Sequence, residues 1–213
     1  KILIVDIALL PRVREALVLA KGNPQLIIYD DAEFDGPRSG YDETEYETFI
    51  ASGDADFAWK MPDDEWDAIT INYTSGTTGD PKGVVYHHRG AYLLAQGNAL
   101  TASMKKQAVY LWTLPMFHCN GWCFPWTISA ISGTHVCLRE VRAEDIWNAI
   151  LKHRVSHMCG APIVMSLVVA GKPASAKLDY KVEFFTAAAP PPEAVLAAMK
   201  DAGFNVTHLY GLT

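Results

Sequence analysis

Short apolar runs alternate with amphipathic helical patterns along most of this chain of 213 residues. Parallel strands need a long connection, usually a helix, so this rhythm predicts strands joined by helical crossovers. Such crossovers are nearly always right-handed, which favours an α/β fold with a doubly wound, mainly parallel sheet flanked by helices. Strands are expected at residues 2–5, 26–29, 68–73, 84–86, 109–113, 135–138, 155–158, 182–186 and 206–210. Helices are expected at residues 10–20, 43–51, 89–104, 122–131, 144–152, 163–170 and 193–202.

Composition places the chain among globular proteins and argues against a nucleic-acid partner. Half of the residues are hydrophobic and 20% are charged, which is enough apolar material for a buried core. The net charge is −6, and no basic patch is visible. Between residues 30 and 67 there are fourteen acidic and two basic residues. We interpret this segment as a solvated connection, and an acidic docking surface is the alternative.

The four cysteines show neither a CxxC pair nor a disulfide framework. Three of them lie near His118 and His135 in the sequence, but the spacing fits no usual zinc pattern. Reduced cysteines, together with the lack of a signal peptide, favour a cytoplasmic protein. No apolar stretch reaches the length of a membrane helix. The chain opens on KILIVD without an initiator methionine, which predicts a buried strand and a piece of something longer.

The segment YTSGTTGDPKG, residues 73–83, has the composition of an anion-binding loop. Its glycines let backbone amides approach a ligand closely. Amides, hydroxyls and the Lys82 ammonium together suit a polyphosphate. A Walker A loop is excluded because Pro81 precedes Lys82 and Gly83 follows it. By composition alone, an ordinary turn after a strand is an equal alternative.

The complete string resembles the phosphate-binding signature of the adenylate-forming (AMP-binding) superfamily, which includes acyl-CoA synthetases, luciferases and peptide-synthetase adenylation domains. The resemblance implies that the loop holds the β- and γ-phosphates of ATP. The implied phosphate-binding residues are Thr74, Ser75, Gly76, Thr77, Thr78, Gly79 and Lys82.

Three further segments resemble that family in its order. PMFHCNGW, residues 115–122, is similar to the segment that lines the acyl pocket. The resemblance implies that His118 gates the channel between acid and CoA, and that Asn120, Gly121 and Ala187 border this channel. For His118 the alternative is a histidine packed beside Trp122 and Trp126.

AAAP, residues 187–190, is similar to the stretch that borders adenine and the acyl chain, which assigns Ala188, Ala189 and Pro190 to adenine. The family often has glycine where Ala187 or Ala188 stands here. A small-residue strand end packed under a helix is the alternative. YGLT, residues 210–213, resembles the start of a Tyr-Gly-x-Thr-Glu motif.

In that motif Tyr210 and Gly211 meet adenine and Thr213 meets the α-phosphate. The magnesium-binding Glu of the family would follow Thr213, so no metal ligand is assigned within the chain. The resemblance therefore implies a partial AMP-binding domain over residues 1–213. Relatives have a segment before Lys1, and after Thr213 a ribose-binding Asp, a hinge and a small domain with a catalytic Lys.

The implied function is ATP-dependent activation of a carboxylic acid to an acyl-adenylate and then to acyl-CoA, with ATP, Mg²⁺ and CoA. Lys82, His118 and Thr213 are the implied catalytic residues. Aromatic side chains around residues 117–126 favour an apolar acid, and we expect a short- or medium-chain fatty acid. Alternatives are an aryl-CoA ligase, a luciferase-like oxidase, an amino-acid adenylation domain and a non-catalytic nucleotide-binding module. These 213 residues alone are expected to be inactive.

Overall fold

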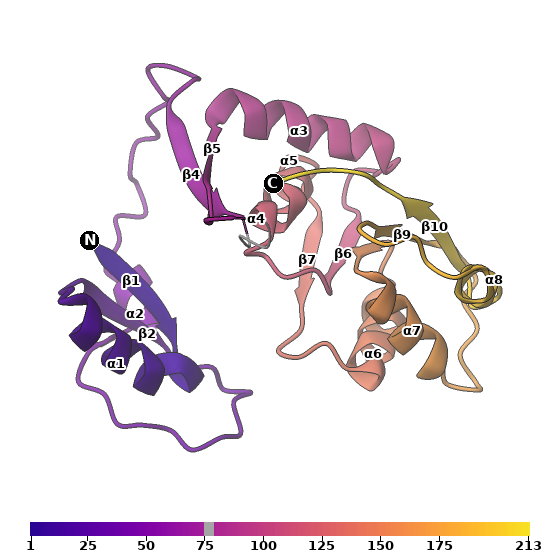
Figure 1. Ribbon diagram of the computed structural model, residues 1–213, viewed down its shortest axis with the longest axis horizontal. Coiled ribbons are helices and arrows are strands. Elements are labelled where there is room, and N and C mark those ends of the chain that lie inside the picture. Colours follow the sequence, from indigo (N-terminus) through magenta and orange to yellow (C-terminus); the bar gives the residue numbers. More distant parts are fainter. Residues whose placement is uncertain (75–78) are drawn as a thin grey trace. The chain divides into compact units, whose positions relative to one another are not determined.

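The chain divides into two compact units, Lys1–Met61 and Pro62–Thr213. The computed structural model describes residues 1–74 and 79–213, and Figure 1 shows the elements of both units. Ser75, Gly76, Thr77 and Thr78 lie outside the described residues. Each unit is described below by itself.

The first unit is a three-stranded parallel sheet in the order β1-β2-β3 with two short α-helices. Its small core contains Val5, Ile7, Leu10 and Ile28. The elements are β1 (Ile2–Asp6), a 3₁₀ turn η1 (Ile7–Leu9), α1 (Leu10–Ala20), β2 (Gln25–Tyr29), β3 (Thr44–Glu45) and α2 (Tyr46–Ala51).

Two expectations for this unit are wrong. The first strand is mostly not buried: Ile2 and Ile4 are each 53% exposed, because, of the residues of β1, only Val5 lies in the small core of the unit. The expected helix over residues 43–51 begins only at Tyr46, because Glu45 is extended and caps it. The Glu45 carboxylate accepts hydrogen bonds from the amides of Glu47 and Thr48, at 2.7 and 3.1 Å.

The acidic segment is more structured than a solvated connection. It contains β3 and α2. The Glu43 carboxylate accepts two hydrogen bonds of 3.0 Å from the Arg14 guanidinium on α1, and this pairing lowers the pKa of Glu43. Part of the negative charge therefore fixes the first unit internally.

The second unit carries a five-stranded, entirely parallel sheet in the order β10-β9-β8-β6-β7. Its strands are β6 (Val109–Trp112), β7 (Thr134–Cys137), β8 (His157–Cys159), β9 (Val182–Thr186) and β10 (Phe204–His208). Its helices are α3 (His88–Thr101), α4 (Cys119–Trp122), α5 (Phe124–Ala130), α6 (Ala143–His153), α7 (Pro162–Ala170) and α8 (Glu193–Asp201).

Helices cover both faces of this sheet. Alternate side chains of the strands point to opposite faces. On one face, Leu111, Met158 and Phe184 pack with the apolar sides of α6, α7 and α8. On the other face, Tyr110, Cys159 and Phe185 pack with α5 and the end of α3. The expectation of a doubly wound, mainly parallel α/β fold is confirmed.

One strand pair departs from parallel pairing. β4 (Ala68–Tyr73) and β5 (Gly83–His87) form a separate antiparallel hairpin. Their connection, residues 74–82, is shorter than the dozen or so residues that a parallel crossover needs. The candidate phosphate loop therefore belongs to a hairpin beside the main sheet.

Some expected boundaries are also wrong. The strand expected at 155–158 is β8, and the strand expected at 206–210 is β10, which ends at His208 and leaves Tyr210 outside the sheet. The helix expected at 122–131 is interrupted, because Cys123 is left-handed with φ 62° and α5 starts at Phe124 with Pro125 in its first turn.

All four cysteines are free. Within residues 1–74 and 79–213, no group of three or more His, Cys, Asp or Glu side chains could hold a metal ion. Over the same residues, every helix is too short or too polar to cross a lipid bilayer.

His157 links β8 to the end of α3, on the face of the sheet that packs with α5. Its ring is 6% exposed, with Nε2 3.0 Å from the Ala102 carbonyl oxygen and Nδ1 2.8 Å from the Ser156 hydroxyl. A neutral ring protonated on Nε2 satisfies both contacts. Burial lowers the pKa of His157 from its ordinary value near 6.5.

We predict that this histidine makes the fold acid-sensitive. The unfolded chain takes up the proton at a higher pH than the folded chain, so the free energy of unfolding falls as pH drops through about 6.5. The fall ends below the folded pKa of His157. Urea denaturation between pH 8 and 5 measures it.

The His157→Gln variant should show a smaller decline over that range, whatever its stability at pH 8. His135, whose pKa is also lowered by burial, remains in the variant and accounts for part of the residual slope. Equal slopes in the two proteins would contradict the prediction.

Candidate active site

The candidate phosphate loop is closed at its base by a pair of hydrogen bonds. The Thr74 amide donates to the Lys82 carbonyl and the Lys82 amide donates to the Thr74 hydroxyl, both at 3.0 Å. Thr74 therefore shapes the loop, and the Lys82 side chain is exposed. A Cβ on Gly79 would meet no atom of the described residues within 4 Å. The predicted phosphate contacts of Ser75, Gly76, Thr77 and Thr78 lie outside the described residues.

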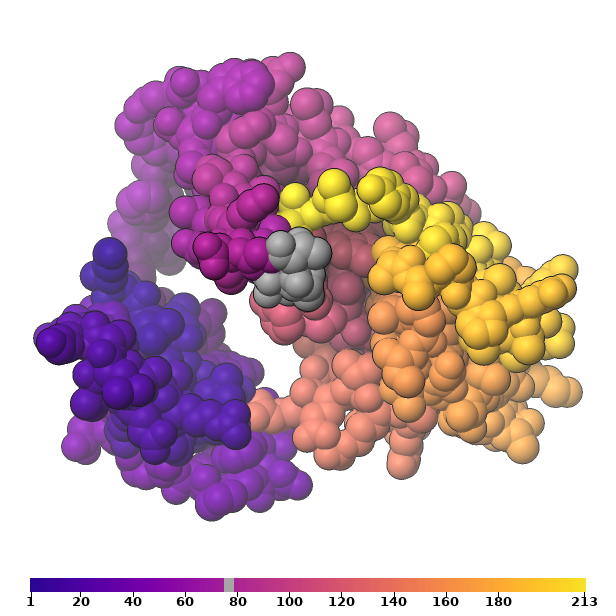
Figure 2. Space-filling model, viewed as in Figure 1, coloured from indigo at the N-terminus to yellow at the C-terminus, as the bar shows by residue number. Residues whose placement is uncertain are grey.

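Parallel pairing brings the other predicted segments together. Residues 113–122 follow β6, residues 187–190 follow β9 and residues 209–213 follow β10, all at the carboxyl edge of one sheet. There they enclose, with β5 and α3, a cavity of about 390 Å³. Figure 2 shows the C-terminal segment, in yellow, lying across this hollow. The lining residues are Tyr86, Leu94, Asn98, Cys119, Trp122, Phe124, Ala187, Leu209, Tyr210, Gly211, Leu212 and Thr213.

A left-handed helical turn forms one wall of this cavity. Residues 119–123 all have positive φ, between 49° and 62°, and only Gly121 is a glycine. Each L-residue in this conformation costs about 1–2 kcal/mol relative to a right-handed helix. Within the turn, the Trp122 amide donates to the His118 carbonyl at 3.3 Å and the Cys123 amide donates to the Asn120 carbonyl at 3.1 Å. So strained a segment persists only where its surroundings hold it.

Neighbouring elements hold the turn from several sides. The Asn120 amide nitrogen donates to the Thr70 hydroxyl on β4 at 2.7 Å. Gly121 is buried against Trp112 at the end of β6. The Asn98 amide nitrogen on α3 donates to the Trp122 carbonyl at 2.7 Å.

The place of Asn120 and Gly121 at the border of the acid and CoA channel stays a prediction. Neither lines the cavity, because the Asn120 side chain turns to Thr70 and Gly121 packs on Trp112. Cys119 and Trp122, their neighbours in the same motif, form the wall instead. The two residues shape the backbone of the predicted channel.

His118 precedes the turn and is exposed. Its ring lies 4.7 Å from the ring of Phe117, which is itself 77% exposed, so His118 is not the packed histidine of the alternative interpretation. Among the described residues it does not line the cavity. Its role as a gate stays a prediction.

The segments after β9 and β10 lie at the surface. Ala187 is half-buried in the cavity wall, whereas Ala188, with φ 73°, Ala189 and Pro190 are exposed. These three residues are thus not packed under a helix. Tyr210 lines the cavity and is 91% exposed, which leaves its ring accessible to a ligand.

No side chain among the described residues that line the cavity is charged at neutral pH. Burial, reinforced by the thiols of Cys119 and Cys123, raises the pKa of Tyr86 to about 12. Burial also raises the pKa of the Cys123 thiol, just behind this wall, to about 11. The wall is therefore neutral and mostly apolar.

Tyr86 and Asn98 were not singled out from the sequence. Leu94 and Asn98 are one helical turn apart, so the helical period places them on one face of α3. Nothing in the sequence says that this face borders the segments after β6 and β10, which are distant along the chain.

Comparison with known proteins assigns the family. The sequence matches the family described as AMP-binding enzyme over residues 1–213. The chain belongs to the AMP-binding enzyme family. It is 51% identical over 171 residues to a peroxisomal acetate/butyrate–CoA ligase of Arabidopsis thaliana, covering 79% of this chain and 30% of that protein. It is 46% identical over 196 residues to an acetate–CoA ligase of Humulus lupulus, covering 89% of this chain and 34% of that protein.

A third similar protein is the peroxisomal trans-cinnamate:CoA ligase of Petunia hybrida, 40% identical over 228 residues, covering 100% of this chain and 40% of the relative. This AMP-binding chain thus spans 30 to 40% of the length of these relatives.

Solved structures share the fold. A luciferase-like enzyme from the mealworm Zophobas morio matches with a TM-score of 0.80 at 19% identity, over 100% of this chain and 49% of that one. The N-terminal domain of FACL13 from Mycobacterium tuberculosis, bound to an inhibitor, matches with a TM-score of 0.71 at 26% identity. That match covers 95% of this chain and 54% of that one.

We predict that Gly121→Ala strongly destabilises the second unit. A Cβ at this position would lie 2.6 Å from Cζ3 of Trp112, and φ is 57°. Strain and overpacking together should lower the free energy of unfolding by about 2–4 kcal/mol. Chemical denaturation followed by circular dichroism measures the loss.

Gly97→Ala is the matched control, because Gly97 lies inside α3 and a Cβ there meets nothing within 4 Å. This change should stabilise the protein by about 0.5–1 kcal/mol, since alanine favours helix over glycine. If Gly121→Ala were as harmless as the control, the left-handed turn would not be a strained, tightly packed element.

Proposed function

We propose that the protein containing this chain is an ATP-dependent acid–thiol ligase that converts a carboxylic acid to its acyl-adenylate and then to acyl-CoA. The observation that carries the proposal is the cavity at the carboxyl edge of the sheet. It brings Tyr210 and Thr213, the implied AMP side, next to Cys119, Trp122 and Ala187, the implied acid side. Family membership and the names of the CoA ligases among the relatives support the same reaction.

The proposed chemistry has two group transfers. A carboxylate oxygen attacks the α-phosphorus of ATP, the bond from that phosphorus to the bridging oxygen breaks, and pyrophosphate leaves. The CoA sulfur then attacks the acyl carbon, and AMP leaves with the electron pair of the broken carbon–oxygen bond. Both steps depend mainly on positioning and on stabilising negative charge.

Each part of the chain has a proposed role in these steps. The loop of residues 74–82 holds the β- and γ-phosphates, with Lys82 as the positive charge. Tyr210, Gly211 and the edge 188–190 contact adenine, and Thr213 contacts the α-phosphate. His118 admits the CoA thiol, and the turn 119–123 with Ala187 shapes the acid side.

In this scheme magnesium binds together with the nucleotide. Magnesium in phosphoryl-transfer sites is held by one or two carboxylates together with substrate phosphates. The described residues supply no ligand cluster of their own. Its function there is to neutralise charge on the phosphates of ATP.

We infer that the acid is apolar and of short or medium length. The names of the similar ligases specify acetate, butyrate, 2-methylpropanoate and trans-cinnamate, so chain length varies among them. A neutral, mostly apolar cavity suits such acids, and the described residues that line it supply no side-chain carboxylate for an α-amino group, which disfavours an amino-acid substrate. An aryl acid is the second candidate, supported by the cinnamate ligase.

The cytoplasm and the peroxisome are the two candidate locations of the protein. Free cysteines agree with the cytoplasm. Two of the similar plant ligases named above are peroxisomal.

The deciding experiment is carboxylate-dependent ATP–pyrophosphate exchange, measured on the product of the complete coding sequence with acids of increasing length. Exchange with a subset of short and medium acids is expected. A folded protein that binds ATP but shows no exchange with any acid would instead be a non-catalytic nucleotide-binding module.

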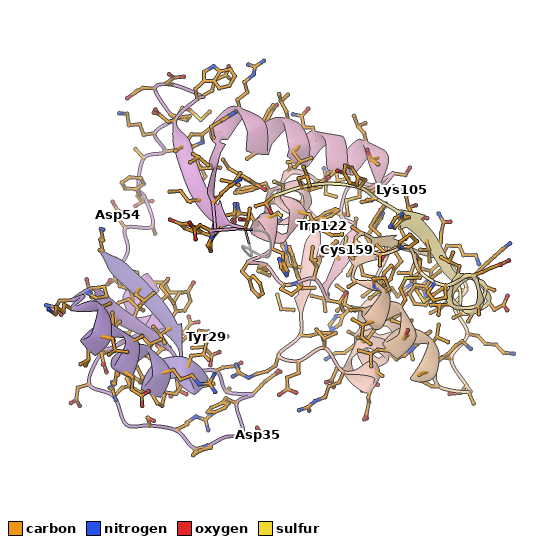
Figure 3. The ribbon with its side chains drawn as sticks, viewed as in Figure 1. Tyr29, Asp35, Asp54, Lys105, Trp122 and Cys159 are labelled. Carbon is orange, nitrogen blue, oxygen red and sulfur yellow. The ribbon has the colours of Figure 1, made fainter. Side chains whose placement is uncertain are left out.

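We predict that Lys82→Ala lowers this exchange about 10- to 100-fold, since a hydrogen bond from a charged group contributes about 1.5–3 kcal/mol. Thermal unfolding should change little, because Lys82 is exposed. Lys105→Ala removes the same charge from another exposed position, labelled in Figure 3, and should leave the exchange rate unaltered. Equal rates of ATP–pyrophosphate exchange in the two variants would show that Lys82 does not bind the phosphates.

A further inference from the structure

Asn98, on α3, joins two segments that the sequence keeps apart. Its side-chain nitrogen donates to the Trp122 carbonyl at 2.7 Å and to the Thr127 hydroxyl at 3.3 Å. The acceptors lie 24 and 29 residues further along the chain. Both hydrogens of one amide group thus hold the left-handed turn and the helix α5 that follows it.

We propose that Asn98 is a positioning residue for the acid-binding side of the cavity. It acts by holding the left-handed turn 119–123 in the conformation that makes Cys119 and Trp122 the cavity wall. The proposal rests on the proposed ligase function, because it assigns this wall to the acid.

The turn needs stabilising contacts from other elements because it has few hydrogen bonds within itself. Four of its five residues are non-glycine residues with positive φ, a conformation that relaxes unless contacts from outside oppose it. If the turn relaxed, the side chains of Cys119 and Trp122 would leave their present directions, since handedness decides where each Cβ points. Figure 3 labels Trp122 in this part of the second unit.

Among the contacts from other elements that hold the turn, that of Asn98 differs from those of Thr70 and Trp112. Thr70 bonds Asn120, and Trp112 packs on Gly121, yet neither Thr70 nor Trp112 lines the cavity. Asn98 is half-buried and lines the cavity itself. It therefore couples the shape of the wall to whatever occupies the space beside it.

The position of the Asn98 hydrogen bonds predicts different effects on the binding of the acid and on the binding of ATP. The two acceptors of the Asn98 amide lie on the turn and on α5, the part of the cavity wall assigned to the acid. Loss of its amide should thus disturb the binding of the acid and leave the binding of ATP nearly unchanged.

The test compares three variants of the complete gene product. Asn98→Leu removes the amide donor and keeps four side-chain heavy atoms branched at Cγ, and Asn98→Gln restores an amide on a longer side chain. Gln96→Leu is the control, because it makes the same kind of change on an exposed position of the same helix.

Two readouts are combined. Amide hydrogen exchange followed by mass spectrometry on peptides covering residues 118–124 should be at least tenfold faster in Asn98→Leu, with residues 182–186 of β9 unchanged. In acid-dependent ATP–pyrophosphate exchange, the KM for the acid should rise about tenfold and the KM for ATP should stay within twofold. Asn98→Gln should recover part of both effects, and Gln96→Leu should resemble the wild type.

An unchanged rate of amide hydrogen exchange in peptide 118–124 of Asn98→Leu would overturn the proposal. An equal rise of the KM for the acid and the KM for ATP would also overturn it. If Asn98→Leu fails to fold, Asn98→Asp replaces it, because an ionised carboxylate of the same shape cannot donate to the Trp122 carbonyl. The same two readouts then decide. A wild-type protein without acid-dependent turnover refutes the ligase function, whereas the hydrogen-exchange comparison still decides whether Asn98 holds the turn.

Discussion

Parallel pairing of β6, β8, β9 and β10 is the constraint on which the rest of the second unit depends. Parallel strands all end at the same edge of the sheet, so the residues that follow them become neighbours although they are far apart in sequence. The segments after β6, β9 and β10 supply most of the cavity wall. The helices that connect the strands bury both faces of the sheet, so the edge is left as the place where polar, irregular backbone can meet a ligand.

This edge also concentrates the unfavourable backbone conformations of the site. The left-handed turn 119–123 lies in the segment that follows β6, and Ala188 lies two residues beyond the end of β9. The turn is strained by itself and is stabilised by a side-chain hydrogen bond from β4, a buried aromatic ring from β6 and an amide from α3. The rigid sheet and helices thus fix a wall that its own sequence would not hold in place.

Charge and apolar character are divided between the two halves of the proposed site. The hairpin loop offers the exposed Lys82, whereas burial keeps the cavity-lining Tyr86 and the nearby Cys123 neutral. A nucleotide with several negative charges and an acid with an apolar tail require this division. In the proposed reaction the carboxylate lies where the two halves meet, beside Ala187 and Thr213.

Local patterns in the sequence determined the α/β class, the positions of most strands and helices, and the motifs at residues 73–83, 115–122, 187–190 and 210–213, because residue spacing and glycine content are local properties. The tertiary structure alone decided that β4 and β5 form a separate antiparallel hairpin and that β1 is an exposed edge strand. It alone decided that Asn120 turns to Thr70, and that Asn98 and Tyr86 join the cavity. These outcomes depend on contacts between residues distant in sequence, which no local pattern encodes, and a turn such as 119–123 takes its conformation from the neighbours that hold it.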